Sequence, residues 1–260
     1  MNARTYETSV SKVKSAERAL SLLDHVAEQG QVRFQDIVEY GIPKSSAHGL
    51  LATLVSSGWL EYSEDTRQYQ LGLHAWQVGQ AYDGHRGLLE AAAPVMDELV
   101  LRMGETVQLA RLEGIENVYI AIRQSPHPMR MASSVGMRLH SHATGIGKAL
   151  LSTLPDGEAK RRLSAVALPR LTENTETEVE KLMHVIGRVR ELGFAVDEEE
   201  FIAGCRCVAV PLTSDEETGI AAAISITMPT LRTDDSWPHG LYPALQGARE
   251  KIRRTMGLMG

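Results

Sequence analysis

Hydrophobic residues in the first part of the chain recur three or four positions apart, in three successive segments. That spacing places them on one face of an α-helix, so the pattern predicts three amphipathic helices. Ser15 is expected to cap the first helix and Gly30 to end it. Gly41 and Pro43 separate the second helix from the third. The expected helices cover residues 15–30, 34–40 and 44–58.

Apolar and polar residues then alternate over the segment WLEYSEDTRQYQLG, residues 59–72. This alternation predicts two short strands, and the polar run from Ser63 to Gln68 predicts the turn between them. Three helices followed at once by a hairpin are typical of a winged helix-turn-helix, which binds duplex DNA. An unrelated three-helix module that packs against another surface is the alternative interpretation.

The third helix and the hairpin carry the residues expected to contact DNA. In a helix-turn-helix the second helix of the pair enters the major groove by its first turns, where small donors and a cation meet base edges and phosphates. An arginine at the tip of the wing can reach a phosphate or the minor groove. The residues predicted to bind DNA are Lys44, Ser45, Ser46, His48 and Arg67.

The predicted winged helix-turn-helix, here called the head, carries an unusual charge for a DNA-binding module. Residues 1–75 hold seven Lys and Arg against nine Asp and Glu, a net charge of −2. Most DNA-binding modules are basic, because neutralised phosphates supply much of the affinity. An acidic head gains affinity when two heads engage one site. We therefore expect a homodimer or tetramer.

Beyond the hairpin, the pattern predicts a connection and a second domain. A helix running to about Tyr82, a break at Asp83 and Gly84, and a long apolar helix over 88–103 come first. From Thr106 the hydrophobic period changes to two. Strands are expected at 106–113, 117–124, 129–135, 194–197, 207–213 and 219–228, the last two linked by a polar hairpin at 214–218.

Helices are set between these strands. They are expected at 145–154, 177–192 and 241–256. The second of them begins with Thr177 and Glu180 at the spacing of a capping box. Hairpin-linked strands with interposed helices predict an α+β domain on an antiparallel sheet, an architecture that commonly holds a small ligand between the sheet and its covering loops.

Length and composition agree with two soluble domains. The chain has 260 residues, of which 43% are hydrophobic and 23% charged, and its net charge is −6. We expect a head over residues 1–75, a linker helix over 76–86 and a second domain over 87–260. No signal peptide and no membrane span are recognised, which predicts a cytoplasmic protein. Cys205 and Cys207 are expected to be reduced thiols.

Three segments carry a resemblance to a known family. They are SAERALSLLDHVAEQG with IPKSSAHGLLATLVSSGWL, then GMRLHSHATGIGKALLS, then LGFAVDEEEFIAGCRCVAVPL followed by AAAISITMP. In this order and spacing the chain, from about Ser15 to the last helix, resembles the IclR family of bacterial transcriptional regulators.

The resemblance implies a winged helix-turn-helix joined by a helix to a C-terminal GAF-like effector-binding domain. It also implies a dimer, or a dimer of dimers, that often represses catabolic operons and responds to small organic acids or aromatic metabolites. We accordingly expect operator DNA and a small-molecule effector as partners, no cofactor and no enzymatic activity.

The family's effector site is carried over by motif. The residues so implied are Gly145, Ile146, Asp197, Cys207, Ser225 and Thr227. Their chemistry is consistent, since the first two open a helix whose free N–H groups attract a carboxylate. Ser225 and Thr227 alternate along one strand, so their hydroxyls face the same side. Asp197 suits a ligand hydroxyl or amine better than a carboxylate, unless it is protonated.

An apolar wall and two departures from the family pattern complete the expected site. Met129, Met131, Met137 and Leu139 are expected to form an adaptable wall. Gly49 follows His48 where family members often carry Arg, and Thr227 replaces a common Ser.

Three other interpretations compete with a regulator. Gly145 to Lys148 reads GIGK, but His142 and Ala149 occupy the positions where a phosphate-binding loop needs Gly and Ser or Thr. A metal site is conceivable from His140, His142, Asp197 and the two cysteines. An enzyme would use Cys207 as the nucleophile with His140 or His142 as its base. All three are less favoured than the regulator.

Overall fold

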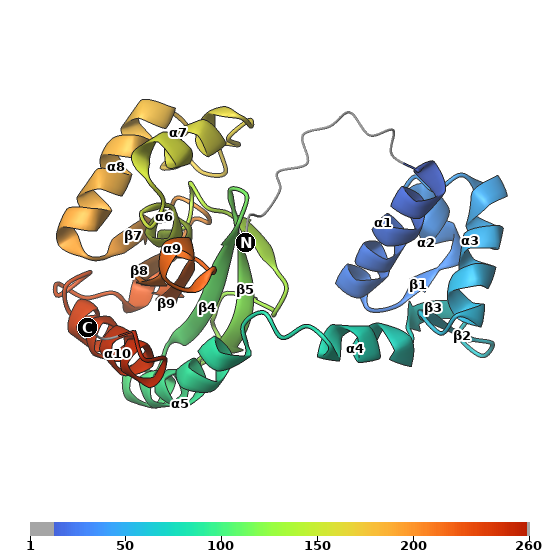
Figure 1. Cartoon of the computed structure of the whole chain (residues 1–260), viewed down its shortest axis with the longest axis horizontal. Helices are drawn as coiled ribbons and strands as arrows, with labels where there is room; N and C mark the ends of the chain where they lie inside the picture. The colour runs from blue at the N-terminus through green and yellow to red at the C-terminus, as the bar shows by residue number, and fades with distance from the viewer. Residues whose placement is uncertain (1–12, 259–260) are drawn as a thin grey trace. The chain divides into compact units, whose positions relative to one another are not determined.

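The computed structural model describes residues 13–258, with the side chain of Asp215 left aside. The chain divides into two compact units, with the boundary between Gly84 and His85 (Figure 1). Each unit has its own hydrophobic core, so each is described by itself.

The first unit is a winged helix-turn-helix. Its elements are α1 (Lys14–Gln29), β1 (Val32–Arg33), α2 (Phe34–Glu39), α3 (Lys44–Ser56), β2 (Leu60–Ser63), β3 (Gln68–Leu71) and α4 (Leu73–Gln80). Strand β3 lies between β1 and β2 in an antiparallel sheet. The core packs Leu22 and Val26 of α1 against Ile37 of α2 and Leu51 of α3. These are the apolar faces that the helical spacing predicts.

The structure corrects four local expectations in this unit. Ser15 lies inside α1, which is preceded by Val13 without a side-chain cap, so Ser15 does not cap the helix. Strand β1 pairs with β3 and was not predicted, because two residues are too short to show a period. Helix α3 ends at Ser56 rather than at residue 58. The linking helix begins at Leu73 and ends at Gln80. Gly30 ends α1 with φ of 77°, as expected.

The second unit is an α+β domain on one antiparallel sheet, with strand order β6-β5-β4-β9-β8-β7. Its strands are β4 (Thr106–Glu113), β5 (Glu116–Arg123), β6 (Arg138–His140), β7 (Ala195–Glu198), β8 (Cys205–Thr213) and β9 (Ala222–Pro229). Its helices are α5 (Arg86–Met103), α6 (Gly145–Leu151), α7 (Asp156–Ser164), α8 (Val179–Leu192), α9 (Asp215–Thr218), η1 (Thr230–Arg232) and α10 (Tyr242–Thr255).

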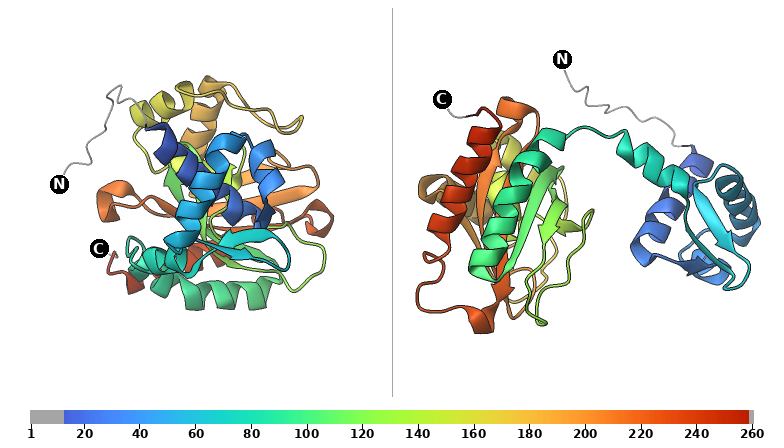
Figure 2. Two further views of the ribbon diagram at one scale, coloured as in Figure 1. Left: turned by 90° about the vertical axis from the view of Figure 1, so that its right-hand side faces the viewer. Right: turned by 90° about the horizontal axis from the view of Figure 1, so that it is seen from below.

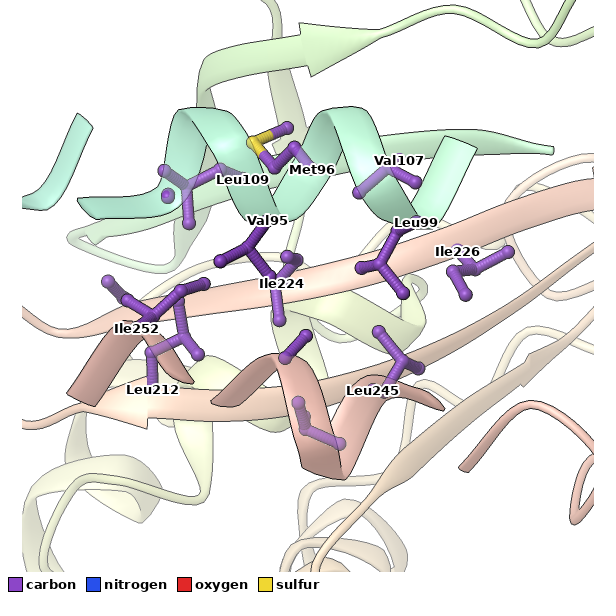
Figure 3. Packing of buried hydrophobic residues seen from close by; sticks show 14 of the residues in the cluster. Val95, Met96, Leu99, Val107, Leu109, Leu212, Ile224, Ile226, Leu245 and Ile252 are labelled. Carbon is purple, nitrogen blue, oxygen red and sulfur yellow. The ribbon is translucent and has the colours of Figure 1, made fainter. Parts of the chain in front are cut away.

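One face of the sheet is covered by α5 and α10, which lie side by side (Figures 1 and 2). Alternate residues of the strands point into this layer, among them Ile224 and Ile226 of β9. Figure 3 shows them beneath Val95 and Leu99 of α5, with Leu245 of α10 on the neighbouring helix. This layer is apolar at its centre, so it is held by burial of apolar surface.

The opposite face is covered by α6, with α7 and α8 packed beyond it (Figure 1). The residues of β8 and β9 that point this way are small or polar, including Ala209, Ala223 and Ser225, whereas β4, β5 and β6 also contribute Leu112, Tyr119 and Leu139. Small side chains allow α6 to approach the sheet closely. This asymmetry between the two faces places the polar residues of the domain in one layer.

Two expectations for the second unit are wrong, and one helix was not predicted. Residues 129–135 form no strand, and the strand of this region is β6 at Arg138–His140. Helix α8 begins at Val179 after Glu178, so Thr177 and Glu180 do not form a capping box. Helix α7 was missed because its sequence, DGEAKRRLS, buries only Ala159 and Leu163. Within the described residues, no helix is long and apolar enough to cross a membrane.

Candidate DNA-binding and effector sites

The first turns of α3 expose the residues predicted to read DNA. Lys44, Ser45 and His48 are exposed, whereas Ala47 is fully buried and anchors the helix. The ring of His48 stacks on Phe34 of α2, with the ring centroids 4.3 Å apart. The head therefore holds this histidine in place before any partner arrives.

Ser46 is half-buried and has a different role from its neighbours. Its hydroxyl accepts a hydrogen bond from Nη1 of Arg18 at 3.1 Å. Arg18 belongs to α1, 28 positions earlier in the chain, so no sequence pattern links the two. The structure thus places Arg18, one of the seven cations already counted in the head, beside the first turns of α3.

The wing presents Arg67 at the turn between β2 and β3. Arg67 is exposed and has φ of 55°, a left-handed conformation that is uncommon for residues other than glycine. Tyr62 and Tyr69 lie opposite each other in the hairpin, with ring centroids 4.8 Å apart. The paired tyrosines stiffen the strands that carry the arginine.

The effector residues predicted on strands form adjoining rows across the sheet. Asp197 lies opposite Cys207, and Cys207 lies opposite Thr227. In the neighbouring row Ser225 lies between Ala209 and Gln108. Since residues two apart share a face, both rows point toward α6.

Helix α6 closes on these rows through its glycines. A Cβ on Gly145 would lie 3.1 Å from both Sγ and the carbonyl oxygen of Cys207. One on Gly147 would lie 2.2 Å from Cα of Ser141, so no side chain fits there. Thr144 caps the helix by accepting the N–H of Gly147 at 3.1 Å. The GIGK segment is therefore a close-packing device, fully buried against the sheet.

The thiol of Cys207 joins the helix to the sheet. It lies within hydrogen-bonding reach of the hydroxyls of Ser225 and Thr227 and of the backbone N–H of Ile146. Asp197 contacts the same layer, because its backbone nitrogen lies 3.3 Å from a Cβ placed on Gly145. The structure brings together all six predicted residues: Gly145, Ile146, Asp197, Cys207, Ser225 and Thr227.

The cluster is closed to solvent. Asp197 and Thr227 are each 6% exposed, and Ser225 is 0% exposed. Among the neighbouring cavities, one of about 380 Å³ lies beyond Lys148 and Glu200, under α8. A ligand must therefore displace part of the cover to reach the six residues.

Asp197 has unusual electrostatics for a carboxyl group. Burial raises its pKa to about 7, although Lys148 and the backbone N–H of Glu200 favour the charged form. Near neutral pH the group is consequently divided between its acid and its carboxylate. A protonated Asp197 can donate a hydrogen bond to a ligand carboxylate, which removes the objection raised from the sequence.

A buried ion pair and a threonine loop hold the segment that follows Asp197. Lys148 of α6 pairs with Glu200, and their side chains are 3% and 14% exposed. Thr175 donates to the carbonyl oxygen of Glu200 at 2.6 Å, and Thr172 donates to that of Glu199 at 2.7 Å. Four side-chain groups thus fix the turn at the edge of the site.

The two cysteines lack the properties of a nucleophile. Burial raises the pKa of Cys207 to about 11 and that of Cys205 to about 12, so both remain thiols at neutral pH. The ring of His142 lies 3.0 Å from the carbonyl oxygen of Pro169 through Nε2, and burial lowers its pKa. The interpretation of Cys207 with His140 or His142 as an enzyme is not supported.

The metal interpretation also lacks a site. Across residues 13–258, no three His, Cys, Asp or Glu side chains lie close enough together to hold an ion. His140 and His142 are near each other, with ring centroids 5.7 Å apart, but no third group joins them in that part of the chain.

Two residues of the layer were missed from the sequence. Gln108 of β4 is 0% exposed and accepts hydrogen bonds from Ser225 and Thr227, both at 3.0 Å. Tyr119 of β5 is 3% exposed, and burial together with the charges of Cys207, Cys205 and Asp197 raises its pKa. The signal for Gln108 was its polar side chain between Val107 and Leu109 in a buried strand.

The expected apolar wall is present in part. Leu139 is 5% exposed and belongs to the cluster that contains Ile146 and Cys207, against which Met131 and Met137 also pack. Met129 is 61% exposed and does not line the cluster. Met129 belongs to residues 129–135, which were expected to form a strand but do not form one.

Comparisons with known proteins agree with this geometry. Residues 15–64 match the IclR helix-turn-helix domain, and residues 80–254 match the bacterial transcriptional regulator IclR C-terminal domain. The HTH-type transcriptional regulator XynR of Escherichia coli is 34% identical over 94% of this chain and 98% of its own length.

Two further similarities extend over most of the chain. The transcriptional repressor IclR of Escherichia coli is 33% identical over 87% of this chain and 84% of its own. The crystal structure of a transcriptional regulator from Rhodococcus sp. RHA1 superposes with a TM-score of 0.78 at 27% identity, covering 95% of this chain and 99% of the other. The head, the six-residue cluster and these similarities together show that the chain belongs to the IclR family of bacterial transcriptional regulators.

Proposed function

We propose that this regulator represses a catabolic operon and that a small organic acid or aromatic metabolite controls it. The observation that carries the proposal is the convergence of six residues from α6, β7, β8 and β9 on one buried layer. A buried cluster of hydroxyls, a thiol and a carboxyl beside a helix N-terminus suits a small polar ligand better than it suits core packing. The similarity to a transcriptional repressor supports the sign of control.

The chain works as three parts in this proposal. The head spans residues 1–75 and binds the operator through Lys44, Ser45, Ser46, His48 and Arg67, with Arg18 held beside them. Residues 76–86 connect it to the effector-binding part, residues 87–260. We place the protein in the cytoplasm, where operator DNA is accessible.

The surface of α4 supports a homodimer. None of the residues of this helix is buried, and its large apolar side chains Leu73 and Trp76 are 63% and 62% exposed. Large exposed apolar side chains on one helix mark an interaction surface, and a second copy would supply the second head that an acidic module needs. Pairing of such dimers would give a tetramer.

The effector acts by changing the placement of two heads relative to their half-sites. A ligand can shift this equilibrium only if it binds one arrangement more tightly than the other. Capture in the buried layer requires the cover over Asp197 and Cys207 to move, which provides that difference.

An operator is first isolated by selecting bound fragments from random genomic DNA. Gel-shift titrations of the selected fragment then run with and without small carboxylates and aromatic acids, each screened for binding by thermal shift. We expect at least one acid to stabilise the protein and to change operator affinity at least tenfold. Unchanged affinity with every stabilising compound would overturn the coupling.

A further inference from the structure

Gln108 belongs to the buried polar layer that contains Asp197, Cys207, Ser225 and Thr227, here called the effector layer. Its position on β4 is opposite Ser225 of β9, and its side chain is completely buried. The amide oxygen accepts hydrogen bonds from the hydroxyls of Ser225 and Thr227, each at 3.0 Å. One glutamine thereby orients both hydroxyls predicted to bind the effector.

The other half of the amide is unsatisfied. Within the part of the chain that the structure describes, Nε2 of Gln108 has no hydrogen-bond acceptor. Buried polar groups in proteins are nearly always paired, so a buried donor without a partner calls for a specific explanation. The two N–H donors of Nε2 lie enclosed beside the hydroxyls of Ser225 and Thr227. They are therefore suited to hydrogen-bond an acceptor atom of a bound ligand.

The surrounding groups define that acceptor. Ser225 and Thr227 lie between Gln108 and the Cys207 thiol, which is also within hydrogen-bonding reach of the N–H of Ile146 at the start of α6. Nε2 and this N–H can only donate, so a ligand that reaches both must carry at least two acceptor oxygens. A carboxylate provides them in the most compact form.

We propose that Gln108 is a specificity-determining residue of the effector site and that its Nε2 donates a hydrogen bond to the carboxylate of a small organic acid. The inference rests on the proposed function and narrows it. Gln108 both fixes the hydroxyls of Ser225 and Thr227 and contacts the ligand directly. Compounds without an acceptor at this point leave the amide unpaired and are rejected.

Two variants separate the contact from the positioning role. Gln108→Glu retains an oxygen that accepts from Ser225 and Thr227 but replaces the Nε2 donor with a second oxygen. Gln108→Met has a similar length and removes donor and acceptor together without adding charge. Gln124→Glu is the matched control, because Gln124 is an exposed glutamine at the end of the adjacent strand and lies outside the cluster.

Binding is measured by titration calorimetry on the full chain. The probes are pyruvate, 4-hydroxybenzoate, and the primary amide of each. For every carboxylate that binds the wild-type chain, we expect Gln108→Glu to weaken binding at least thirtyfold and Gln108→Met about tenfold, since a desolvated charged hydrogen bond is lost. Gln124→Glu should stay within twofold of wild type. Primary amides should lose less affinity than carboxylates in Gln108→Glu.

A second measurement does not depend on variant folding. In the ¹⁵N-labelled wild-type protein, the Gln108 side-chain amide protons should shift downfield when a carboxylate binds. Their signal is assigned by its loss in Gln108→Met, or by selective glutamine labelling and contact with Ser225 if that variant does not fold.

Each outcome decides between the two proposals. If a probe binds wild type and Gln108→Glu equally, or the amide signal does not move, the role of Gln108 is overturned while the effector site stands. If no carboxylate binds the wild-type chain, the effector class is wrong and the inference falls with it. Tighter binding by Gln108→Glu would show that this position accepts rather than donates.

Discussion

The carboxylate of Asp197 accepts a hydrogen bond from the backbone N–H of Glu200 at 2.7 Å. This bond and the charge of Lys148 favour the ionised form, yet burial outweighs both and raises the pKa to about 7. A polar group in the middle of a closed layer therefore retains its proton over most of the acidic range. The energetic consequence is that Asp197 makes the stability of its domain depend on pH.

Asp197→Asn should remove that dependence. Between the ordinary pKa of 3.8 and the folded value of about 7, Asp197 is protonated in the folded chain and ionised in the unfolded chain, so its contribution to stability falls as pH rises. The fall amounts to about 4 kcal/mol at most and stops above the folded pKa. Urea unfolding from pH 4 to 8 should show the variant gaining on wild type up to about pH 7. Parallel stability curves would contradict the assignment.

Breaking the Lys148–Glu200 pair should destabilise the effector domain. The Lys148 side chain is 3% exposed, so Lys148→Met leaves the carboxylate of Glu200 uncompensated and should lower the free energy of unfolding by about 3 kcal/mol. Adding Glu200→Gln should restore part of the loss, because the buried charge is then gone. The measurement is urea unfolding of both variants at pH 7.5.

Lys181→Met is the control for that pair. Lys181 and Glu178 form an exposed pair, with side chains 59% and 64% exposed, whose loss should change stability by less than about 1 kcal/mol. Equal effects of Lys148→Met and Lys181→Met, or no recovery in the double variant, would show that burial does not amplify the interaction.

The thiols should react slowly in the native chain. Because burial raises the pKa values of Cys205 and Cys207 to about 12 and 11, iodoacetamide at pH 7.5 meets almost no thiolate. We expect alkylation at least a hundredfold slower than in the urea-unfolded chain, and slower still with a bound carboxylate. Fast alkylation that follows histidine deprotonation would instead indicate a nucleophile.

Lys44→Ala should weaken operator binding without affecting the effector site. Each phosphate contact contributes about 0.9 to the slope of log affinity against log salt, so the slope should decrease by that amount. Arg18→Ala should act similarly, and Ser46→Ala more mildly, because Ser46 holds Arg18 in place. Gel shifts at several salt concentrations measure the slope.

Lys160→Ala is the matched control for the head, since its exposed side chain belongs to the effector-binding part. It should leave the salt slope unchanged, while thermal shift should show unaltered acid binding in all four variants. A slope for Lys44→Ala equal to wild type would discredit the assigned DNA-binding face.

The sequence predicted the elements whose buried faces follow a regular hydrophobic period. The aliphatic faces of the head helices and most strands followed directly from spacing, because a buried face requires it. Residues 129–135 were wrongly predicted to form a strand because their alternating methionines resemble one. Of the two methionines, only Met131 packs against the hydrophobic cluster. Helix α7 could not be predicted from hydrophobic periodicity because only two of its nine residues are buried.

The candidate site was predicted to a similar extent. Motif resemblance implied six candidate effector residues, and the sheet register brings those on β7, β8 and β9 into adjoining rows. Arg18 beside Ser46 and Gln108 beside Ser225 could not be inferred, since each pair joins distant segments, 28 and 117 positions apart. Such contacts depend on tertiary packing, which spacing along the chain does not encode.

Strict alternation along β9 has a mechanical consequence. Ser225 faces the effector layer, and its two chain neighbours, Ile224 and Ile226, insert beneath α5 on the opposite face (Figure 3). A peptide backbone cannot displace one residue without moving the next. We therefore expect a displacement on the polar side of strand β9 to shift Ile224 and Ile226 against α5, the helix that follows the DNA-binding head in the chain.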